Sequence, residues 1–277
     1  MKVAVIGCSG AMGSYFVRRF IADGHDVTGS DIRRGTRLPA GLSFTSSNPG
    51  AVREADVTLF AVPIRDTVEV VREVSPRLKE RSIAVEITSV KAKVRSELKL
   101  TLGRRAVRLI SVHPLFGPLS AARNPKILVI GGAREASIAD SLFPWADLIR
   151  LGEKEHDRAM AYALSLVHLL NLAFVSALKS GTGVGEFARM ATPMGAAQLN
   201  IAKAVLSQDP SLYSYIQLEN PYVVEAISSA IKELVRLRKI IAGKDAQEFE
   251  ERFVSLSAEF GRRDLADALE KVYSASS

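Results

Sequence analysis

The first half of the chain alternates short hydrophobic runs with amphipathic stretches. The runs are rich in Val and Ile and have the length of β-strands: 3–6, 26–30, 57–61, 83–87, 108–112, 127–130 and 148–151. The stretches between them have the spacing of one-sided helices: 11–23, 66–74, 92–98 and 137–145. Strands that alternate with helices predict a mostly parallel sheet that helices cover on both faces.

The second half has only helical periodicity. Residues 153–178 keep it for about seven turns, and three glycines then interrupt it: Gly181, Gly183 and Gly185. Further helical patterns follow at 191–207, 221–242, 246–260 and 264–273. Pro221 suits the first turn of a helix, and Asn220 before it could cap that helix.

This change of pattern predicts two domains. We expect an α/β domain with a mostly parallel sheet over residues 1–152 and an all-helical domain over residues 153–277. The apolar faces of the helical domain are too long to be buried within it, which favours a homodimer formed through this domain. A self-contained helical bundle is the alternative.

The composition is that of a globular protein, with 47% hydrophobic and 24% charged residues among 277. No uninterrupted apolar run reaches the roughly 20 residues that span a bilayer, and the N-terminal run lacks the features of a signal peptide. The single cysteine, Cys8, excludes an internal disulfide. We therefore expect a cytoplasmic protein with no membrane partner.

The net charge of +7 has more than one interpretation. Binding to nucleic acid would need a basic stripe with interleaved aromatic residues, whereas the basic residues are scattered and only 6% of residues are aromatic. We expect no nucleic-acid partner. The charge serves surface solubility or attracts a small anionic substrate.

A glycine-rich turn follows the first strand run. Its glycines, Gly7, Gly10 and Gly13, have the spacing G-x-x-G-x-x-G, a variant of the dinucleotide-binding G-x-G-x-x-G. Gly7 would make the turn, Gly10 would let the backbone approach a pyrophosphate, and Gly13 would let the helix pack on the strand. The amides of the turn and of the first helical residues would bind the anion. We also assign Ser9, Ala11, Met12 and Val62 to the cofactor site.

Asp31 closes the second strand run, 18 positions beyond Gly13. An acidic residue about 20 positions on is the usual partner of the ribose hydroxyls, so the first domain is predicted to be Rossmann-like. Asp31 would repel a 2′-phosphate and favours NAD. Arg33, also assigned to the cofactor site, lies with Arg34 and Arg37 in the same place and could hold that phosphate, so NADP is the alternative.

His113 is the leading catalytic candidate. It follows an apolar run and precedes Pro114-Leu115-Phe116-Gly117-Pro118, so we expect a rigid loop at the C-terminal end of a strand. Open α/β sheets bind ligands at that edge, where an imidazole suits proton transfer near neutral pH. A structural histidine is the alternative.

A second candidate is Ser89, in Thr88-Ser89-Val90-Lys91. Its hydroxyl could form a hydrogen bond with a substrate hydroxyl or with His113, or it could cap the next helix. Lys91 in the same segment could steer anions or face solvent.

The helical half carries further polar candidates. His156 and Asp157 suit a domain junction or a helix start. His168 lies among leucines and is either a core histidine or a substrate contact. Arg189 follows the glycines and could bind a carboxylate through its planar guanidinium, or extend to solvent. No group of residues has metal-ligand spacing, so we expect no metal.

Taken together, these segments resemble the prephenate/arogenate dehydrogenase family of tyrosine biosynthesis. The resemblance rests on the glycine turn ending in Met12-Gly13, on Thr88-Ser89-Val90-Lys91, on the segment from His113 to Pro118 and on the pair His156-Asp157 with His168. It implies an NAD(P)-dependent oxidoreductase that converts prephenate to 4-hydroxyphenylpyruvate with loss of CO2, or acts on arogenate. It also implies that His113 accepts the hydroxyl proton, that Ser89 holds the hydroxyl, and that Arg189 and His168 contact the substrate.

The chain also departs from the family pattern. Leu119-Ser120 stand where the family often has an acidic residue soon after the histidine segment. We expect neither a chorismate mutase segment before the cofactor domain nor a regulatory domain after the helices. A β-hydroxyacid-type dehydrogenase would need a lysine four residues before an asparagine, and Asn171 and Lys179 lack that spacing. A cofactor-sensing regulator without turnover is the non-enzymatic alternative.

Overall fold

The computed structural model describes residues 1–36, 38–103, 105–118 and 124–274. Its internal contacts divide the chain into two compact units. The first comprises Met1–Met160 with Leu218–Asn220, and the second comprises Ala161–Gln217 with Pro221–Ser277. The expected boundary at residue 152 falls just after the last strand, and helix α6 (Glu153–Met160) beyond it still belongs to the first unit.

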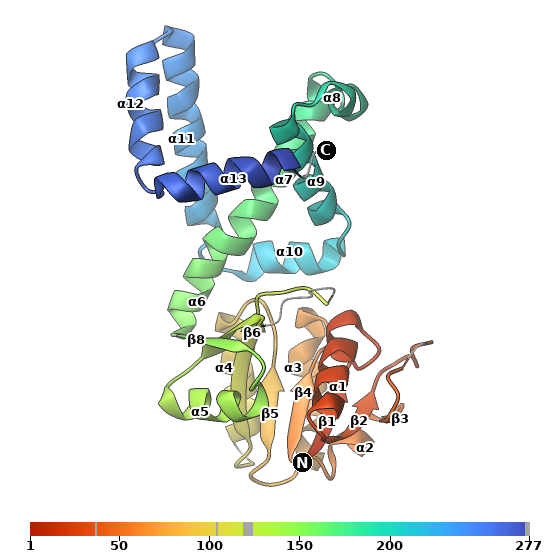
Figure 1. The fold of residues 1–277 in the computed structure, drawn as a ribbon. Coiled ribbons are helices and arrows are strands. Elements are labelled where there is room, and N and C mark those ends of the chain that lie inside the picture. Colours follow the sequence, from red (N-terminus) through yellow and green to blue (C-terminus); the bar gives the residue numbers. More distant parts are fainter. Residues whose placement is uncertain (37, 104, 119–123, 275–277) are drawn as a thin grey trace. The chain divides into compact units, whose positions relative to one another are not determined.

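Eight strands form one sheet in the first unit (Figure 1). They are β1 (Lys2–Ile6), β2 (Asp26–Ser30), β3 (Leu42–Thr45), β4 (Val57–Phe60), β5 (Ile83–Glu86), β6 (Arg108–Pro114), β7 (Lys126–Ile130) and β8 (Asp147–Leu151). Their order is β3-β2-β1-β4-β5-β6-β7-β8, and only β6 and β7 are antiparallel neighbours. The predicted mostly parallel sheet is confirmed. The strand order reverses between β1 and β4, where such sheets open a crevice for ligands.

Helices cover both faces of this sheet (Figure 1). The helical elements of the first unit are α1 (Ala11–Ala22), α2 (Asn48–Val52), α3 (Ile64–Val74), the 3₁₀ turn η1 (Ser75–Arg77), α4 (Ala92–Gly103) and α5 (Ala133–Leu142), with α6 beyond the last strand. On one face, Phe16 and Phe20 of α1 pack on Phe143 after α5, with ring centroids 5.9 and 6.3 Å apart. Figure 1 shows α3 and α4 on the opposite face.

Besides the short turn η1, a strand and a helix of the first unit were not predicted from the sequence. Strand β3 is half-buried at the edge of the sheet and has no run of apolar residues. Helix α2 has five residues, too few for helical periodicity, and begins with Ser47 Oγ accepting the amide of Gly50 at 3.1 Å. Helix α2 therefore lacks helical periodicity, whereas the residues of β3 alternate between apolar and polar, a strand pattern that a search for apolar runs does not detect.

The second unit is helical throughout its described residues. Its elements are the π-helical segment η2 (Ala161–Leu166), α7 (Val167–Ser180), α8 (Val184–Met190), α9 (Pro193–Leu206), α10 (Pro210–Glu219), α11 (Val223–Gly243), α12 (Ala246–Ser257) and α13 (Arg262–Ser274). The expected all-helical half is confirmed, although α8 and α10 were not predicted. Gly181 ends α7 and Gly183 precedes α8 with φ 83°, but Gly185 lies inside α8.

Asn220 does not cap the helix after it, contrary to expectation. Helix α11 begins later, at Val223, with Tyr222 before it. The Asn220 side chain is buried, and its Nδ2 donates to the carbonyl of Asp157 at 2.8 Å. This long-range bond fixes Asn220 in the first unit, away from the position of a cap.

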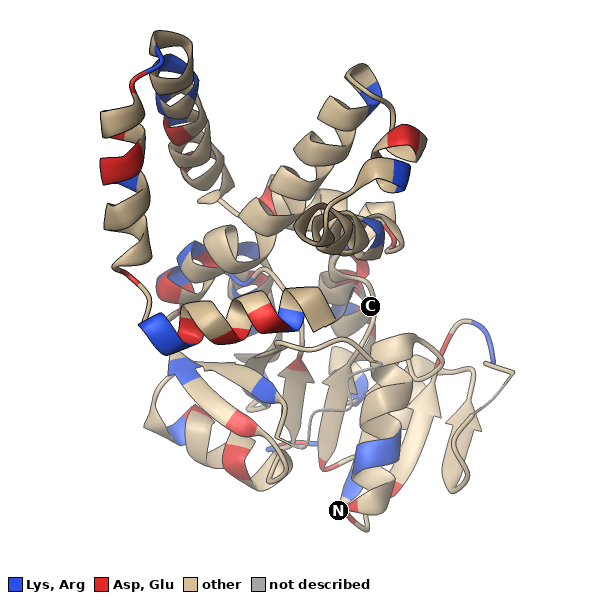
Figure 2. Ribbon diagram, turned by 45° about the horizontal axis from the view of Figure 1, so that its top comes forward, with Lys and Arg blue, Asp and Glu red and all other residues tan. Residues whose placement is uncertain are grey.

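Residues Glu153–Ser180 form one continuous helix that has the length and apolar composition needed to cross a membrane. The sequence of this helix has no long uninterrupted apolar run, because small and polar residues are interspersed among its apolar residues. Only 22% of its apolar window is buried within the chain. In Figure 2, the ribbon positions of Lys and Arg (blue) and of Asp and Glu (red) alternate along other helices, as on α13.

Candidate active site

Most of the predicted site residues of the first unit lie at one edge of the sheet. Strands β1, β2, β4, β5 and β6 run parallel, so their C-terminal ends share that edge. The glycine turn follows β1, and His113 lies at the end of β6, three strands away across β4 and β5. Because neighbouring strands lie about 4.8 Å apart, these two features are separated by about 14 Å along the sheet.

The glycine turn is built so that side chains are excluded. Gly7 has φ +83°, and a Cβ there would lie 2.5 Å from the carbonyl oxygen of Ala61 and 3.2 Å from Val62. A Cβ on Gly13 would collide with the carbonyl oxygen of Gly7. Gly10 stands at the N-cap of α1, and no side chain caps that helix. The turn therefore leaves the backbone amides at the start of α1 available to an anion.

Asp31 lies directly beyond β2 and reaches the glycine turn. Its Oδ2 accepts the amide of Ser9 at 2.9 Å, and its Oδ1 accepts the amide of Arg33 at 3.4 Å. Ser9 Oγ in turn accepts the amide of Gly35 at 3.0 Å. A carboxylate therefore closes the turn on the side where a ribose would bind.

Two of the neighbouring arginines lie within the described residues. Arg33 is exposed, and the Arg34 guanidinium lies 5.5 Å from the ring of Phe44. Arg37 lies outside the described residues, as do Leu119 and Ser120. Asp31 is therefore the charged group that contacts the turn directly.

His113 lies in strand β6 and not in a loop, contrary to expectation. Its backbone pairs with Leu128 of β7, because the antiparallel ladder continues through Pro114. Ser111 is the last residue of β6 that pairs with β5, so His113 projects beyond the end of that strand. The side chain is 6% exposed, and its Nδ1 lies 3.0 Å from Nε2 of His156. Its other ring nitrogen, Nε2, has no hydrogen-bond partner among the described residues.

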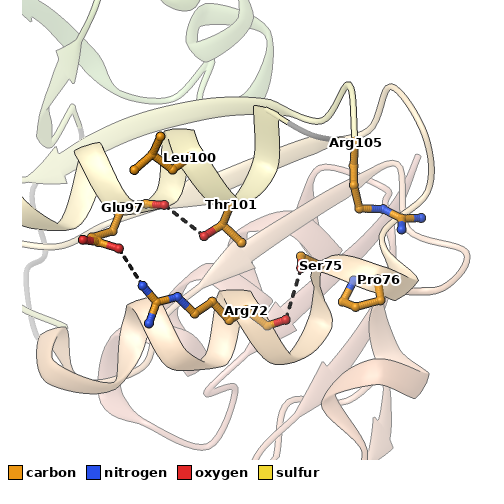
Figure 3. Close-up of a pocket in the computed structure, with 7 residues that line it drawn as sticks. All are labelled: Arg72, Ser75, Pro76, Glu97, Leu100, Thr101 and Arg105. Carbon is orange, nitrogen blue, oxygen red and sulfur yellow. Dashed lines mark hydrogen bonds and ion pairs between the residues drawn. The ribbon is translucent and has the colours of Figure 1, made fainter.

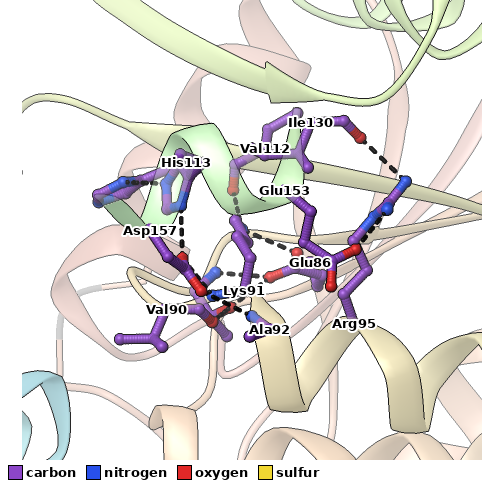
Figure 4. Close-up of polar contacts among 12 residues, drawn as sticks. Glu86, Val90, Lys91, Ala92, Arg95, Val112, His113, Ile130, Glu153 and Asp157 are labelled. Atoms are coloured by element: carbon purple, nitrogen blue, oxygen red, sulfur yellow. Dashed lines mark hydrogen bonds and ion pairs between the residues drawn. The ribbon is translucent and has the colours of Figure 1, made fainter. Parts of the chain in front are cut away.

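His156 on α6 contacts His113, and its neighbour Asp157, labelled in Figure 4, joins the same site. Nδ1 of His156 lies 2.7 Å from Oδ1 of Asp157. The Asp157 carboxylate also accepts the amides of Lys91 at 3.0 Å and Ala92 at 2.9 Å. Asp157, and not Ser89, therefore caps α4. Burial opposes ionisation of Asp157, but the bonds from His156, Ala92 and Lys91 outweigh it and lower the pKa of the carboxyl.

Lys91 is fully buried, so neither sequence interpretation of it was correct. Its Nζ lies 2.8 Å from Oε1 of Glu86 and donates to the carbonyl of Val112 at 2.8 Å. Oε2 of Glu86 accepts the amide and hydroxyl of Thr88 at 2.8 and 2.6 Å. Glu86 was missed, although a carboxylate within the apolar run 83–87, followed closely by Lys91, is a signal for such a pair.

Burial lowers the pKa of His113 well below its usual value, and the positive charge of Lys91 and the neighbouring His156 lower it further. The imidazole is therefore neutral at pH 7 and can accept a proton. Desolvation also lowers the pKa of Lys91, against the opposing effect of Glu86. Ser89 is half-buried near this network but makes no hydrogen bond to His113.

The two predicted substrate residues of the helical half belong to the second unit. His168 is buried, stacks on Tyr213 with ring centroids 4.1 Å apart and has its Nδ1 3.4 Å from Gln217. Burial lowers the pKa of His168. Arg189 is exposed in the last turn of α8. Within the first unit, the structure brings together His113, His156, Asp157 and Lys91.

A surface cavity of about 470 Å³ lies between α3 and α4 (Figure 3). Its lining includes Arg72 and Glu97, which form an ion pair of 2.6 Å, and Arg105. None of the predicted site residues lines it. No group of metal-binding side chains occurs among the residues that the structure describes.

The parallel sheet, its glycine turn and the imidazole at the same edge define the first unit as a nucleotide-binding domain of the dehydrogenase type. Two family descriptions match the chain in this order. "Prephenate dehydrogenase, nucleotide-binding domain" matches residues 17–126, and "Prephenate dehydrogenase, dimerization domain" matches residues 153–255. The chain belongs to the prephenate dehydrogenase family.

Individual relatives agree with this assignment. A probable arogenate/prephenate dehydrogenase from Methanocaldococcus jannaschii is 26% identical over 274 residues, covering 94% of this chain, which spans only 61% of that protein's length. A cyclohexadienyl dehydrogenase from Zymomonas mobilis is 29% identical over 277 residues, with 91% and 92% covered. The crystal structure of prephenate dehydrogenase from A. aeolicus with hydroxyphenyl propionate and NAD+ has a TM-score of 0.74 at 20% identity, covering 94% of this chain and 96% of that chain. This last likeness shows that the fold is shared.

Proposed function

We propose that this chain is an NAD-dependent dehydrogenase that converts prephenate to 4-hydroxyphenylpyruvate and CO2 in the cytoplasm, as a homodimer. The observation that carries the proposal is a buried, neutral imidazole at the same sheet edge as the glycine turn, three strands from it. The membership of the prephenate dehydrogenase family supports the reaction class. The family's dimerization domain supports the homodimer.

The residues of the glycine turn fit a dinucleotide. Gly7 and Gly13 leave space that a Cβ would fill, and the Asp31 carboxylate lies beside Ser9. Gly10 and the first amides of α1 would hold the pyrophosphate, and Asp31 would accept the ribose hydroxyls and disfavour a 2′-phosphate. When bound, NAD supplies a hydride acceptor. The solved relative from A. aeolicus was crystallised with NAD+.

His113 would receive the proton of the ring hydroxyl. As that proton leaves, the hydride departs from the same ring carbon, the ring carboxylate is lost as CO2, and the electron pair of the broken bond completes the aromatic ring. His113 then returns the proton to the phenolic oxygen. Ser89 would hold the hydroxyl, Arg189 would bind a carboxylate of the substrate, and His168 would contact the substrate. The same ring chemistry applies to arogenate.

An absorbance assay at the reduced-nicotinamide band tests this function with prephenate and arogenate, each with NAD and NADP. We expect turnover of prephenate with a preference for NAD. Since the pKa of His113 lies well below 6.5, the neutral form persists in mildly acidic solution, and kcat/KM should fall only at pH values well below 6.5.

The substitution H113N should lower kcat by about 10²-fold or more and change KM much less, because it removes the proton acceptor. H25N is a matched control, since His25 precedes β2 at the opposite edge of the sheet. A kcat of H113N close to that of the unmodified enzyme would refute the role of His113. Stoichiometric NAD binding without turnover of either substrate would favour the cofactor-sensing alternative.

A further inference from the structure

We propose that Asp157 and His156 are positioning residues that fix the tautomer of His113, so that its Nε2 carries the free lone pair. This inference rests on the proposed function, because it explains how His113 is kept ready to accept a proton. The three side chains form a chain of short contacts, His113 Nδ1 to His156 Nε2 at 3.0 Å and His156 Nδ1 to Asp157 Oδ1 at 2.7 Å.

The direction of the hydrogen bonds follows from Asp157. Its two oxygens accept the amides of Lys91 and Ala92, so it is held as a carboxylate and can only accept. Nδ1 of His156 must then donate to it. A neutral His156 consequently has no proton on Nε2 and accepts from Nδ1 of His113. Neutral His113 is thereby left unprotonated at Nε2, the nitrogen without a partner among the described residues.

Burial and charge keep this pattern in place. His156 and Asp157 are 0% exposed, and His113 is 6% exposed, so water does not compete for the ring nitrogens. The charged neighbours of the rings are Lys91, whose charge acts on His113 and which is paired with Glu86 at 2.8 Å, and Asp157 on α6, which contacts His156. When His113 takes up a proton at Nε2, the negative charge of Asp157 stabilises the cation through His156.

An alternative proton pattern makes the proposal testable. If His156 were an imidazolium, it would donate from both nitrogens. Nδ1 of neutral His113 would then be the acceptor, and the proton would sit on Nε2, where no base would remain. The two patterns differ in which nitrogen of each ring carries hydrogen.

Nitrogen-15 NMR of the imidazoles in the full chain distinguishes these patterns, with H25N, H168N and H156N used to assign the four histidines. We expect His113 and His156 both in the Nδ1–H form near pH 7. In D157N, the side-chain amide can donate to His156, and the His113 signals should shift toward the Nε2–H form. A wild-type His113 already in the Nε2–H form, or one unchanged in D157N, would overturn the proposal.

Activity provides a second readout. D157N should lower kcat by roughly 10² to 10⁴-fold with KM less affected, as expected when a base is held in the wrong tautomer. H156N leaves the Asp157 cap of α4 in place but breaks the link to His113, so it should lose kcat as well. If only D157N lost activity, Asp157 would merely cap the helix. NMR needs no substrate, so a chain with the expected tautomers but no turnover would contradict the proposed function alone.

Discussion

Lys91 and Glu86 form an ion pair from which water is excluded, with both side chains 0% exposed. Breaking such a pair leaves one charge buried without its partner, which costs more than the pair itself contributes. The pair also lies one residue from the proton acceptor, because Lys91 Nζ binds the carbonyl of Val112. The contribution of the pair to the free energy of unfolding can be measured without an activity assay.

We expect K91M to reduce the free energy of unfolding by about 3–5 kcal/mol, because Glu86 is then left unpaired. The double variant K91M/E86Q should recover part of this loss, since no buried charge remains. Denaturant unfolding followed by circular dichroism measures both. K79M is the control: Lys79 and Asp56 are 2.6 Å apart but exposed, so its effect should be much smaller. Equal effects of K91M and K79M would contradict the argument.

At this scale, the sequence predicted single residues better than their partners. His113 was found from the prolines and glycine that follow it, which are local signals. His156 is 43 positions away, and no local pattern links the two rings. Lys91 was ambiguous for a different reason. Its partner Glu86 is close in sequence, at the end of β5, but only packing shows that both side chains are fully buried. Arg189 and His168 remain predictions.

Among the elements, the buried strands were predicted closely because each is a short apolar run. The unpredicted elements β3, α2, α8 and α10 are short or half-exposed, and the sequences of the three helices carry little periodicity. Strand β6 extends beyond its apolar run to Pro114. Its last residues pair with β7 on one side, after the pairing with β5 on the other side has ended at Ser111. Antiparallel pairing at that point placed His113 in a strand, and local sequence does not encode such pairing.

The close packing of α1 on β1 depends on Gly13. Since a Cβ there would collide with the Gly7 carbonyl, we expect G13A to displace the helix, lower the thermal midpoint by several degrees and weaken NAD binding by at least about tenfold. Calorimetry measures both effects. G103A is the matched control, because nothing lies within 4 Å of a Cβ at the end of α4. NAD binding by G13A at unchanged affinity would argue against the pyrophosphate site.

Considered as a whole molecule, the chain leaves much apolar surface uncovered in its helical unit. Helix α11 carries Ile231, Leu234 and Ile241, which are 53%, 56% and 65% exposed. Leu234 and Ile241 are one heptad apart and share a face of the helix. A second copy of the chain would cover such a surface, in keeping with the dimerization domain that the sequence matches.

We expect the chain to sediment as a dimer at micromolar concentration and the double variant L234D/I241D to sediment as a monomer, because two carboxylates would have to be buried at the interface. S229D adds a charge on another face of α11 and should leave the dimer intact. A monomeric unmodified chain would contradict the prediction. Flotation of the chain with lipid vesicles would instead assign the apolar helix Glu153–Ser180 to a membrane.

The only cysteine lies under the glycine turn, fully buried, where a Cβ on Gly29 would come within 2.7 Å of its sulfur. Burial, more than any other influence, raises the pKa of the Cys8 thiol. An alkylating reagent can reach this sulfur only when the β1–α1 junction opens. The rate of alkylation of Cys8 therefore reports how often that junction opens locally. A ligand bound at the turn should slow the alkylation.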